Sequence, residues 1–349
     1  MQKKIIIFGN LGYIGPVLVK HLRSLSKSLE IVGYDNGLFQ GCLLNPEHSY
    51  ERYLSSQIYG DIRFFNNEVL KNADAVICLA AISNDPIGKA YEKQTIDINA
   101  TSSIELAKAA KKAGVKKFIY ASSCSVYGIM DKGIKSEESQ LNPLTAYSKS
   151  KILCENGLKK LISKEFSVTC LRFSTACGYS PRLRLDLVLN DFVASALINK
   201  KIELLSDGSA WRPIIDVKDM SRSIVWAINR DIGNRGFLAL NIGKDSWNFT
   251  IKDLAESVKN VIPNVDISYV KDALPDKRSY KVDFSLFKFL APEHQPIQTI
   301  YNTIKEIADG ITNSNFKVKD FRKSHLVRLN TLNYLREQKL INGNLEWIN

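Results

Sequence analysis

The chain has 349 residues, of which 45% are hydrophobic and 24% charged, so it can bury a large core as a globular protein does. Its net charge of +12 suits either a nucleic-acid binder or an enzyme with anionic substrates, but lysines such as Lys108, Lys111 and Lys112 are spread along expected helix surfaces, and we expect no nucleic-acid partner. No apolar run approaches the roughly 18 residues that span a membrane, and the six cysteines form no C-x-x-C pair.

Three expectations follow from the lack of such a run and of paired cysteines, and a fourth follows from the position of the first strand. We expect no membrane partner, no metal site and no disulfide framework. The first strand begins almost at residue 1 and leaves no room for a signal peptide, so we expect a cytoplasmic protein.

The first predicted element is a short buried strand at residues 4–8, followed by a glycine-rich turn and an apolar-periodic helix near 13–26. The turn reads Gly9-Asn10-Leu11-Gly12-Tyr13-Ile14-Gly15, and Pro16 fits the first helical turn. Glycines here let the turn tighten and let the diphosphate of a dinucleotide approach the helix N-terminus. A strand before the turn and a helix after it favour this interpretation.

The second predicted strand, at residues 30–34, is followed by an acidic residue, Asp35. A carboxylate at this place accepts hydrogen bonds from ribose hydroxyls and repels a 2′-phosphate, which favours NAD over NADP. The alternative is an ordinary Asp that opens the turn Asp35-Asn36-Gly37.

Further strands are expected near 75–80, 117–122 and 167–173, with helices near 89–113 and 144–163 between them. This alternation predicts βαβ units and a parallel sheet. Beyond residue 178 the elements become shorter, which indicates a smaller substrate-binding domain. The fold class is therefore α/β, a Rossmann-type doubly wound parallel sheet with a smaller C-terminal substrate-binding domain.

Tyr147 and Lys151 stand four residues apart on the helix expected near 144–163, so they share one helical face. The ammonium of Lys151 is expected to draw the pKa of Tyr147 from about 10 towards neutrality, so that the phenol can act as a general base or acid. Ser123, upstream, supplies a hydroxyl that can hold a substrate oxygen. Such a set suits the interconversion of an alcohol and a ketone beside a nicotinamide. The same spacing recurs at Tyr301 and Lys305, which we interpret as a solvated helix face.

Other segments add to these patterns, namely Gly60-Asp61-Ile62, Leu79-Ala80-Ala81, Asn99 and the run Tyr120-Ala121-Ser122-Ser123-Cys124-Ser125-Val126-Tyr127-Gly128. In order along the chain, all of these motifs resemble the extended short-chain dehydrogenase/reductase family, specifically the NAD-dependent epimerase/dehydratase group acting on nucleotide sugars. The resemblance covers roughly residues 1–295.

The resemblance implies NAD as cofactor, a nucleotide-sugar substrate, and Ser123, Tyr147 and Lys151 as the catalytic residues. It also implies a cofactor site that includes Tyr147 and Lys151 together with Gly9, Gly12, Tyr13, Ile14, Gly15, Asp35, Asn36, Asp61, Ile62, Leu79, Ala80, Ala81 and Asn99. On the substrate side it implies Ser123, Ser125, Thr175 (where family members often carry Asn), Arg212 and Arg278. Arg212 would bind phosphate and Arg278 phosphate or ribose; a surface ion pair is the alternative for each.

The resemblance also implies a domain organisation. Residues 1–178 would form the NAD-binding Rossmann domain, with returning segments near 213–242, and residues 179–295 would mainly form the substrate-binding domain. Residues 296–349 would be a helical extension of unassigned role, with helical patterns at 297–311 and 326–338. A homodimer or higher homo-oligomer is implied as well.

For the activity, the resemblance implies an epimerase or a 4-oxidoreductase that oxidises a sugar hydroxyl at C4, with Tyr147 as base. Family 4,6-dehydratases carry an Asp and a Glu where this chain has Cys124 and Ser125, which disfavours a dehydratase but leaves it as an alternative beside a keto-sugar reductase. A dinucleotide-binding sensor or structural subunit without turnover is the non-enzyme alternative. The presence of Ser123, Tyr147 and Lys151 together disfavours it.

Overall fold

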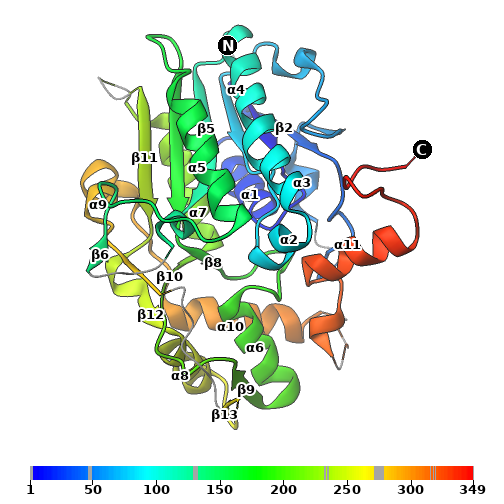
Figure 1. The fold of residues 1–349 in the computed structure, drawn as a ribbon, viewed down its shortest axis with the longest axis vertical. Helices are drawn as coiled ribbons and strands as arrows, with labels where there is room; N and C mark the ends of the chain where they lie inside the picture. The colour runs from blue at the N-terminus through cyan, green and yellow to red at the C-terminus, as the bar shows by residue number, and fades with distance from the viewer. Residues whose placement is uncertain are drawn as a thin grey trace.

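The computed structural model describes residues 3–45, 49–128, 133–231, 233, 236–270, 279–314, 316, 318 and 320–348. Seven parallel strands form the central sheet, in the order β11-β7-β5-β4-β1-β2-β3 (Figure 1). Their bounds are β1 Lys4–Phe8, β2 Glu30–Asp35, β3 Ser56–Tyr59, β4 Ala75–Cys78, β5 Lys117–Ser123, β7 Ser167–Phe173 and β11 Phe237–Ile242. The predicted Rossmann-type fold is confirmed.

The strand order reverses beside β1. From β1 the chain builds β2 and β3 on one side and then crosses to β4 on the other. In open parallel sheets of this kind, ligands bind outside the carboxyl ends of the strands at such a reversal.

Alternating side chains of each strand cover two opposite faces of the sheet. Ile5 and Ile7 pack in one core with α1 (Gly15–Leu25), α7 (Val217–Asn229) and α9 (Ser285–Leu290). Ile6 and Phe8 pack in the other core with α4 (Ser103–Lys112) and α5 (Ala146–Lys159). Because strands buried on both faces must be apolar throughout, they appear in the sequence as continuous apolar runs.

The helix expected at 89–113 differs from the structure. It begins earlier and consists of α2 (Asp85–Ala90), α3 (Glu92–Ile96), a π-helical stretch (Asp97–Ser102) and α4. Asn84 fixes the early start, because its side chain accepts a hydrogen bond from the backbone N–H of Ile87, 2.9 Å away. Pro86 fits the first turn.

The strand expected at 75–80 ends at Cys78. The backbone N–H groups of Leu79 and Ala80 both turn to the carbonyl of Phe8, at 2.8 and 3.0 Å. The strand β3 was not predicted. Its sequence Ser56-Gln57-Ile58-Tyr59 is short and mostly exposed, as suits the sheet edge.

A second layer lies beyond the carboxyl ends of the sheet (Figure 1). Its core joins Leu189, Leu254 and Ile304 from three helices. The helices are α6 (Val188–Asn199), α8 (Ile251–Val261) and α10 (Ile300–Thr312), and the strands of this region are β8 (Thr175–Cys177), β9 (Lys201–Leu204), β10 (Trp211–Asp216), β12 (Asn248–Thr250) and β13 (Asp266–Tyr269). The strands β6 (Ile134–Lys135) and β14 (Lys281–Val282) form a further short pair.

The last helix, α11 (Arg328–Glu337), lies beside α2 (Figure 1). Leu332 and Leu335 belong to the same core as β1 and α4, and so do Ile341 and Leu345 beyond the helix. The end of the chain thus packs on the sheet layer. Among the described residues, we find no helix with the length and apolar character needed to cross a membrane.

Candidate active site

A cavity of about 910 Å³ lies at the carboxyl ends of the central strands, between the sheet and the second layer. Most of the sequence-predicted site residues line it: Gly9, Gly12, Tyr13, Ile14, Asp35, Asn36, Asp61, Ile62, Leu79, Ala80, Ala81, Ser123, Ser125, Tyr147, Lys151, Thr175 and Arg212. Gly15 and Asn99 do not line the cavity. Arg278 lies outside the described residues.

Three glycines shape the turn between β1 and α1. Gly9 has φ +85°, and a Cβ there would collide with the backbone of Ala80; a Cβ on Gly15 would collide with the backbone of Asn10. Gly12 differs, because its Cβ would approach only the carbonyl of Gly9, at 3.3 Å, while the residue borders the cavity. No side chain caps the N-terminus of α1. An uncapped helix N-terminus beside a cavity fits a diphosphate group.

Asp35, the last residue of β2, and Asp61, two residues after β3, both border the cavity. The carboxylate of Asp35 accepts hydrogen bonds from the backbone N–H groups of Leu11 (3.0 Å) and Gly37 (2.8 Å), while burial raises its pKa. Asp61 pairs with Arg63, with Nη2 2.6 Å from Oδ2, and this guanidinium lowers the pKa of Asp61 despite its burial. Both acids are therefore held in place by the protein itself.

Tyr147 and Lys151 lie in the first two turns of α5, whose start is fixed by a capping box. The Thr145 side chain accepts from the N–H of Ser148, 3.2 Å away, and the Ser148 hydroxyl accepts from the N–H of Thr145, 3.1 Å away. Lys151 Nζ donates to the Ala121 carbonyl (2.7 Å) and lies 5.5 Å from the centre of the Tyr147 ring.

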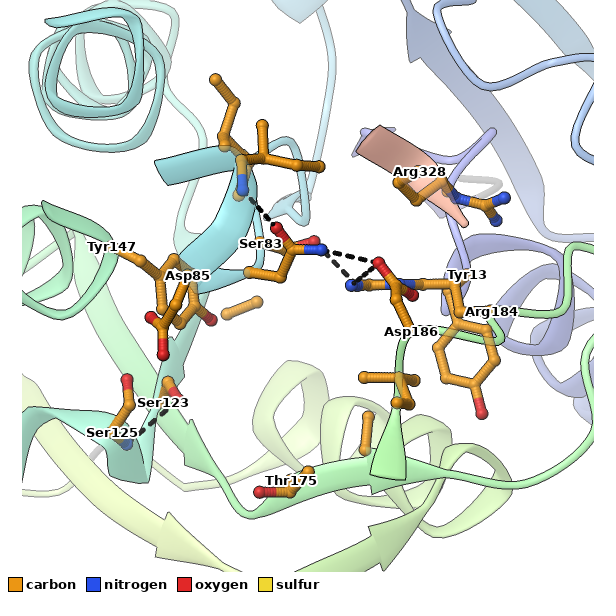
Figure 2. A pocket seen from close by; sticks show the side chains of 18 of the residues that line it. Tyr13, Ser83, Asp85, Ser123, Ser125, Tyr147, Thr175, Arg184, Asp186 and Arg328 are labelled. Carbon is orange, nitrogen blue, oxygen red and sulfur yellow. Dashed lines mark hydrogen bonds and ion pairs between the residues drawn. The ribbon is translucent and has the colours of Figure 1, made fainter. Parts of the chain in front are cut away.

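Ser123, at the end of β5, completes the predicted catalytic set (Figure 2). Its hydroxyl oxygen accepts a hydrogen bond from the N–H of Ser125, 3.1 Å away. Figure 2 shows Ser123, Ser125 and Asp85 gathered beside Tyr147. The hydroxyl oxygen of Ser125 is buried and has no hydrogen-bond partner among the described residues, and the residue borders the cavity.

The expected effect of Lys151 on Tyr147 is wrong for this structure. Burial raises the pKa of Tyr147 and outweighs the hydrogen bond with Ser123 and the charge of Arg184, which both lower it. Burial also lowers the pKa of Lys151 to about 8. Desolvation disfavours both charged forms, and spacing along a helix does not reveal desolvation.

Asn99 holds the loop after β4 rather than facing the cavity. Its side chain accepts from the N–H of Ile82 (2.8 Å) and donates to the carbonyl of the same residue (2.9 Å). It also donates to the hydroxyl of Ser150 on α5, 3.0 Å away. This amide therefore ties the loop containing Leu79, Ala80 and Ala81 to the helix that bears Tyr147.

The predicted substrate residues Thr175 and Arg212 line the opposite part of the cavity, from β8 and β10. Arg212 donates to the carbonyl of Trp211 (2.9 Å), and its guanidinium lies 5.9 Å from the centre of the Tyr280 ring. Both residues are half-buried.

The sequence motifs missed one cluster of charged residues in the cavity wall (Figure 2). Arg184 donates to both carboxylate oxygens of Asp186, at 2.9 and 3.1 Å, and to the hydroxyl of Ser83, at 2.8 Å. Asn84 donates to Asp186 as well (2.6 Å). In the sequence, the only hint of this cluster is the pair of arginines in the run Pro181-Arg182-Leu183-Arg184, soon after the strand β8. Arg328, also in the wall, has no such signal, because it lies in a segment without motifs.

The chain was compared with known proteins. Residues 5–243 match the model of the NAD dependent epimerase/dehydratase family. The UDP-glucose 4-epimerase of Pasteurella multocida is 27% identical over 74% of this chain and 82% of its own length, and that of Bacillus subtilis is 25% identical over 74% and 81%. A solved structure of MoeE5 in complex with UDP-glucuronic acid and NAD is 25% identical, covers 89% of this chain and 99% of its own, and gives a TM-score of 0.75.

Proposed function

This chain belongs to the NAD-dependent epimerase/dehydratase family with NAD as cofactor, and from that premise we propose that it is a nucleotide-sugar epimerase or 4-oxidoreductase. The reaction that we propose begins with oxidation of the C4 hydroxyl of the sugar to a ketone. The observation that carries the proposal is that Ser123, Tyr147 and Lys151 line the same cavity as the glycine turn. Relatives named UDP-glucose 4-epimerase support this choice of substrate class and carbon.

In the proposed mechanism, Tyr147 accepts the proton of the C4 hydroxyl, and Ser123 holds the same oxygen by a hydrogen bond. The glycine turn and Asp35 would hold NAD, which would supply the hydride acceptor and a positive charge of the kind that lowers the pKa of a nearby tyrosine. Lys151 Nζ, which donates to the Ala121 carbonyl at 2.7 Å and lies 5.5 Å from the centre of the Tyr147 ring, would hold the ribose of the cofactor. In an epimerase Tyr147 returns the proton when the ketone is reduced from its other face.

A 4,6-dehydratase is less compatible with the residues beside Ser123. Cys124 stands where family dehydratases carry an acid, and it is buried, with its thiol 3.0 Å from the Arg172 carbonyl and its pKa raised by that burial. A buried thiol with a raised pKa is a poor proton shuttle.

One observation nevertheless keeps the dehydratase as the second candidate. Asp85 lines the cavity on the same side as Ser123 and Tyr147 (Figure 2). Elimination needs an acid–base group next to the oxidised carbon, and a carboxylate here is of the right type. Asp85→Asn separates the two candidates, because it would abolish an elimination and leave proton transfer at C4 with Tyr147.

The test is to incubate the full chain with NAD and a panel of UDP-, GDP-, TDP- and CDP-sugars. The absorbance of NADH and the proton NMR spectrum of the sugar are followed together. A changed sugar spectrum without accumulated NADH identifies an epimerase, and stoichiometric NADH with a keto sugar identifies a 4-oxidoreductase. A new 6-methyl signal identifies the dehydratase instead. A protein that binds NAD but converts no sugar of the panel would contradict the proposal.

A further inference from the structure

The C-terminal segment, defined here as residues 320–348, forms part of the wall of the cavity. Trp347 Nε1 donates to the carbonyl of Asn36 (2.6 Å), and Arg63 Nη1 donates to the carbonyl of Asn344 (2.7 Å). Leu345 lines the cavity near Asp61 and Ile62. The family match ends at residue 243, so this part of the wall is not described by the family motifs.

Arg328, the first residue of α11, is the buried cation of this segment. It is 3% exposed, and its Nη2 donates to the carbonyl of Arg182, 2.8 Å away. Its Nη1 has no hydrogen-bond partner among the described residues, and no described carboxylate forms an ion pair with it. A guanidinium that is buried with an unused donor and no paired carboxylate is costly, because the hydrogen bond to Arg182 replaces only part of its lost hydration.

The neighbouring arginines each form an ion pair with a carboxylate, whereas Arg328 forms none with a described carboxylate. Arg182 pairs with Glu51 at 2.8 Å, and Arg184 pairs with Asp186 at 2.9 Å. Burial lowers the pKa of Arg328, and the charges of Arg184 and Arg182 lower it further. Cys42 and the carboxylate of Asp186, which is paired with Arg184, offset this only in part. An anion in the cavity would supply the missing counterion.

Two ligands of the proposed reaction carry a diphosphate, the dinucleotide and the nucleotide sugar. The surroundings of Arg328 favour the dinucleotide. Its guanidinium lies 5.4 Å from the centre of the Phe39 ring, four residues beyond Asp35, whereas Arg212 lies on the other side of the site, on β10. The uncapped N-terminus of α1 borders the same cavity.

We propose that Arg328 donates hydrogen bonds to the diphosphate of the bound dinucleotide, so that the C-terminal segment completes the cofactor site. This inference rests on the proposed function for its choice of ligand. Arg328 and the first turn of α1 would then hold the diphosphate together, and the segment would retain the cofactor during turnover.

The test measures the affinities of the full chain for NAD and for UDP separately by titration calorimetry. Arg328→Gln is expected to lower the affinity for NAD about 10- to 100-fold, the range for a lost charge-assisted hydrogen bond, and to leave the affinity for UDP unchanged. The matched control is Arg336→Gln on the same helix, because Arg336 is exposed and does not line the cavity. A lower affinity for UDP with an unchanged affinity for NAD would contradict the proposal and assign Arg328 to the substrate instead. Unchanged affinities for both ligands, or an equal loss in the control, would overturn the proposal.

Thermal unfolding separates a ligand role from a structural one. If Arg328 serves the ligand, Arg328→Gln removes an uncompensated charge, so the Tm without NAD holds or rises while the increase on adding NAD shrinks. A lower Tm without NAD and an undiminished increase would show a structural role and contradict the proposal. If the Gln variant does not fold, Arg328→Lys takes its place in the test. It keeps the charge but loses the paired N–H donors of the guanidinium, so it should show an intermediate loss of NAD affinity. Since no sugar is present, these measurements stand even if the protein converts no nucleotide sugar.

Discussion

The guanidinium of Arg172 on β7 and the carboxylate of Glu155 on α5 form a buried ion pair, with Nη2 2.7 Å from Oε2. Arg172 Nε donates to the same carboxylate at 3.0 Å, and the hydroxyl of Ser122 donates to it at 2.5 Å. Glu155 lies one helical turn beyond Lys151. The pair therefore fixes the helix that bears Tyr147 and Lys151 against β7, and the Ser122 hydroxyl ties the same carboxylate to β5, the strand that ends at Ser123.

Glu155→Ala should destabilise the fold by about 3–5 kcal/mol, because it leaves the charge of Arg172 buried without a partner. Denaturant unfolding measures the change. Glu105→Ala is the control, since Glu105 pairs with Lys108 at 2.7 Å on the exposed surface, where such pairs are worth about 0–1 kcal/mol. Equal losses in the two variants would contradict the assigned role of the buried pair.

Tyr147→Phe should lower turnover by about 10²- to 10⁴-fold, the range for a lost general base, with little change in NAD affinity. Initial rates by NMR and calorimetric titration with NAD measure the two effects. Tyr301→Phe is the control: Tyr301 also precedes a lysine by four residues, but it is 55% exposed and outside the cavity. Full activity in the Tyr147 variant would exclude the proposed mechanism.

Gly12→Ala should weaken the binding of NAD by about 1–3 kcal/mol, the usual cost of overpacking, because the new methyl group would lie at the edge of the cavity. The Tm without NAD should change little, since the Cβ approaches only the Gly9 carbonyl. Gly41→Ala is the control, because no atom lies within 4 Å of its Cβ. A loss of fold in the Gly12 variant, without a specific loss of NAD, would show that this glycine is needed for packing alone.

Asp216 predicts a pH dependence of stability. This buried residue caps α7, and its oxygens accept from the N–H of Lys218 (2.8 Å) and the hydroxyl of Thr303 (2.7 Å). Burial, together with the charge of Asp219, raises its pKa to about 6, although the hydrogen bonds and Lys218 lower it. The folded state therefore holds this proton more tightly than the unfolded state does. Its contribution to stability is greatest below about pH 4 and is lost as the pH rises through 6.

Asp216→Asn should reduce this fall in stability between about pH 4 and pH 7 by about 3 kcal/mol, because the amide does not titrate and still caps the helix. Urea unfolding of both proteins across this range measures the difference. Parallel pH profiles for wild type and variant would contradict the raised pKa.

The sheet could be predicted because its strands are buried on both faces and therefore appear as continuous apolar runs. The strand β3 escaped prediction, since an edge strand needs no such run and Ser56-Gln57-Ile58-Tyr59 is mostly exposed. The early start of the helical run at Asp85 depends on the cap from Asn84, a local signal that an apolar pattern does not register.

Most motif residues could be predicted to lie together because they follow the carboxyl ends of parallel strands, and Tyr147 and Lys151 join them from α5. Arg184 and Arg328 could not be predicted to lie there, because the packing of the second layer and of the chain end brings them to the cavity. The pKa of Tyr147 was misjudged for a related reason. Its charge neighbours follow from helical spacing, but its desolvation follows only from the folded structure.

The order in which the chain is made gives the C-terminal segment a further consequence. A ribosome finishes every strand of the sheet and the whole glycine turn before it adds Arg328 and Leu345. A product whose synthesis stops before α11 would still contain residues 5–243 and match the family in full. Its cavity, however, would be open along the wall that α11 and Leu345 provide. Translation through α11 and Leu345 is thus a condition for an enclosed site, although a shorter product would still match the family by sequence.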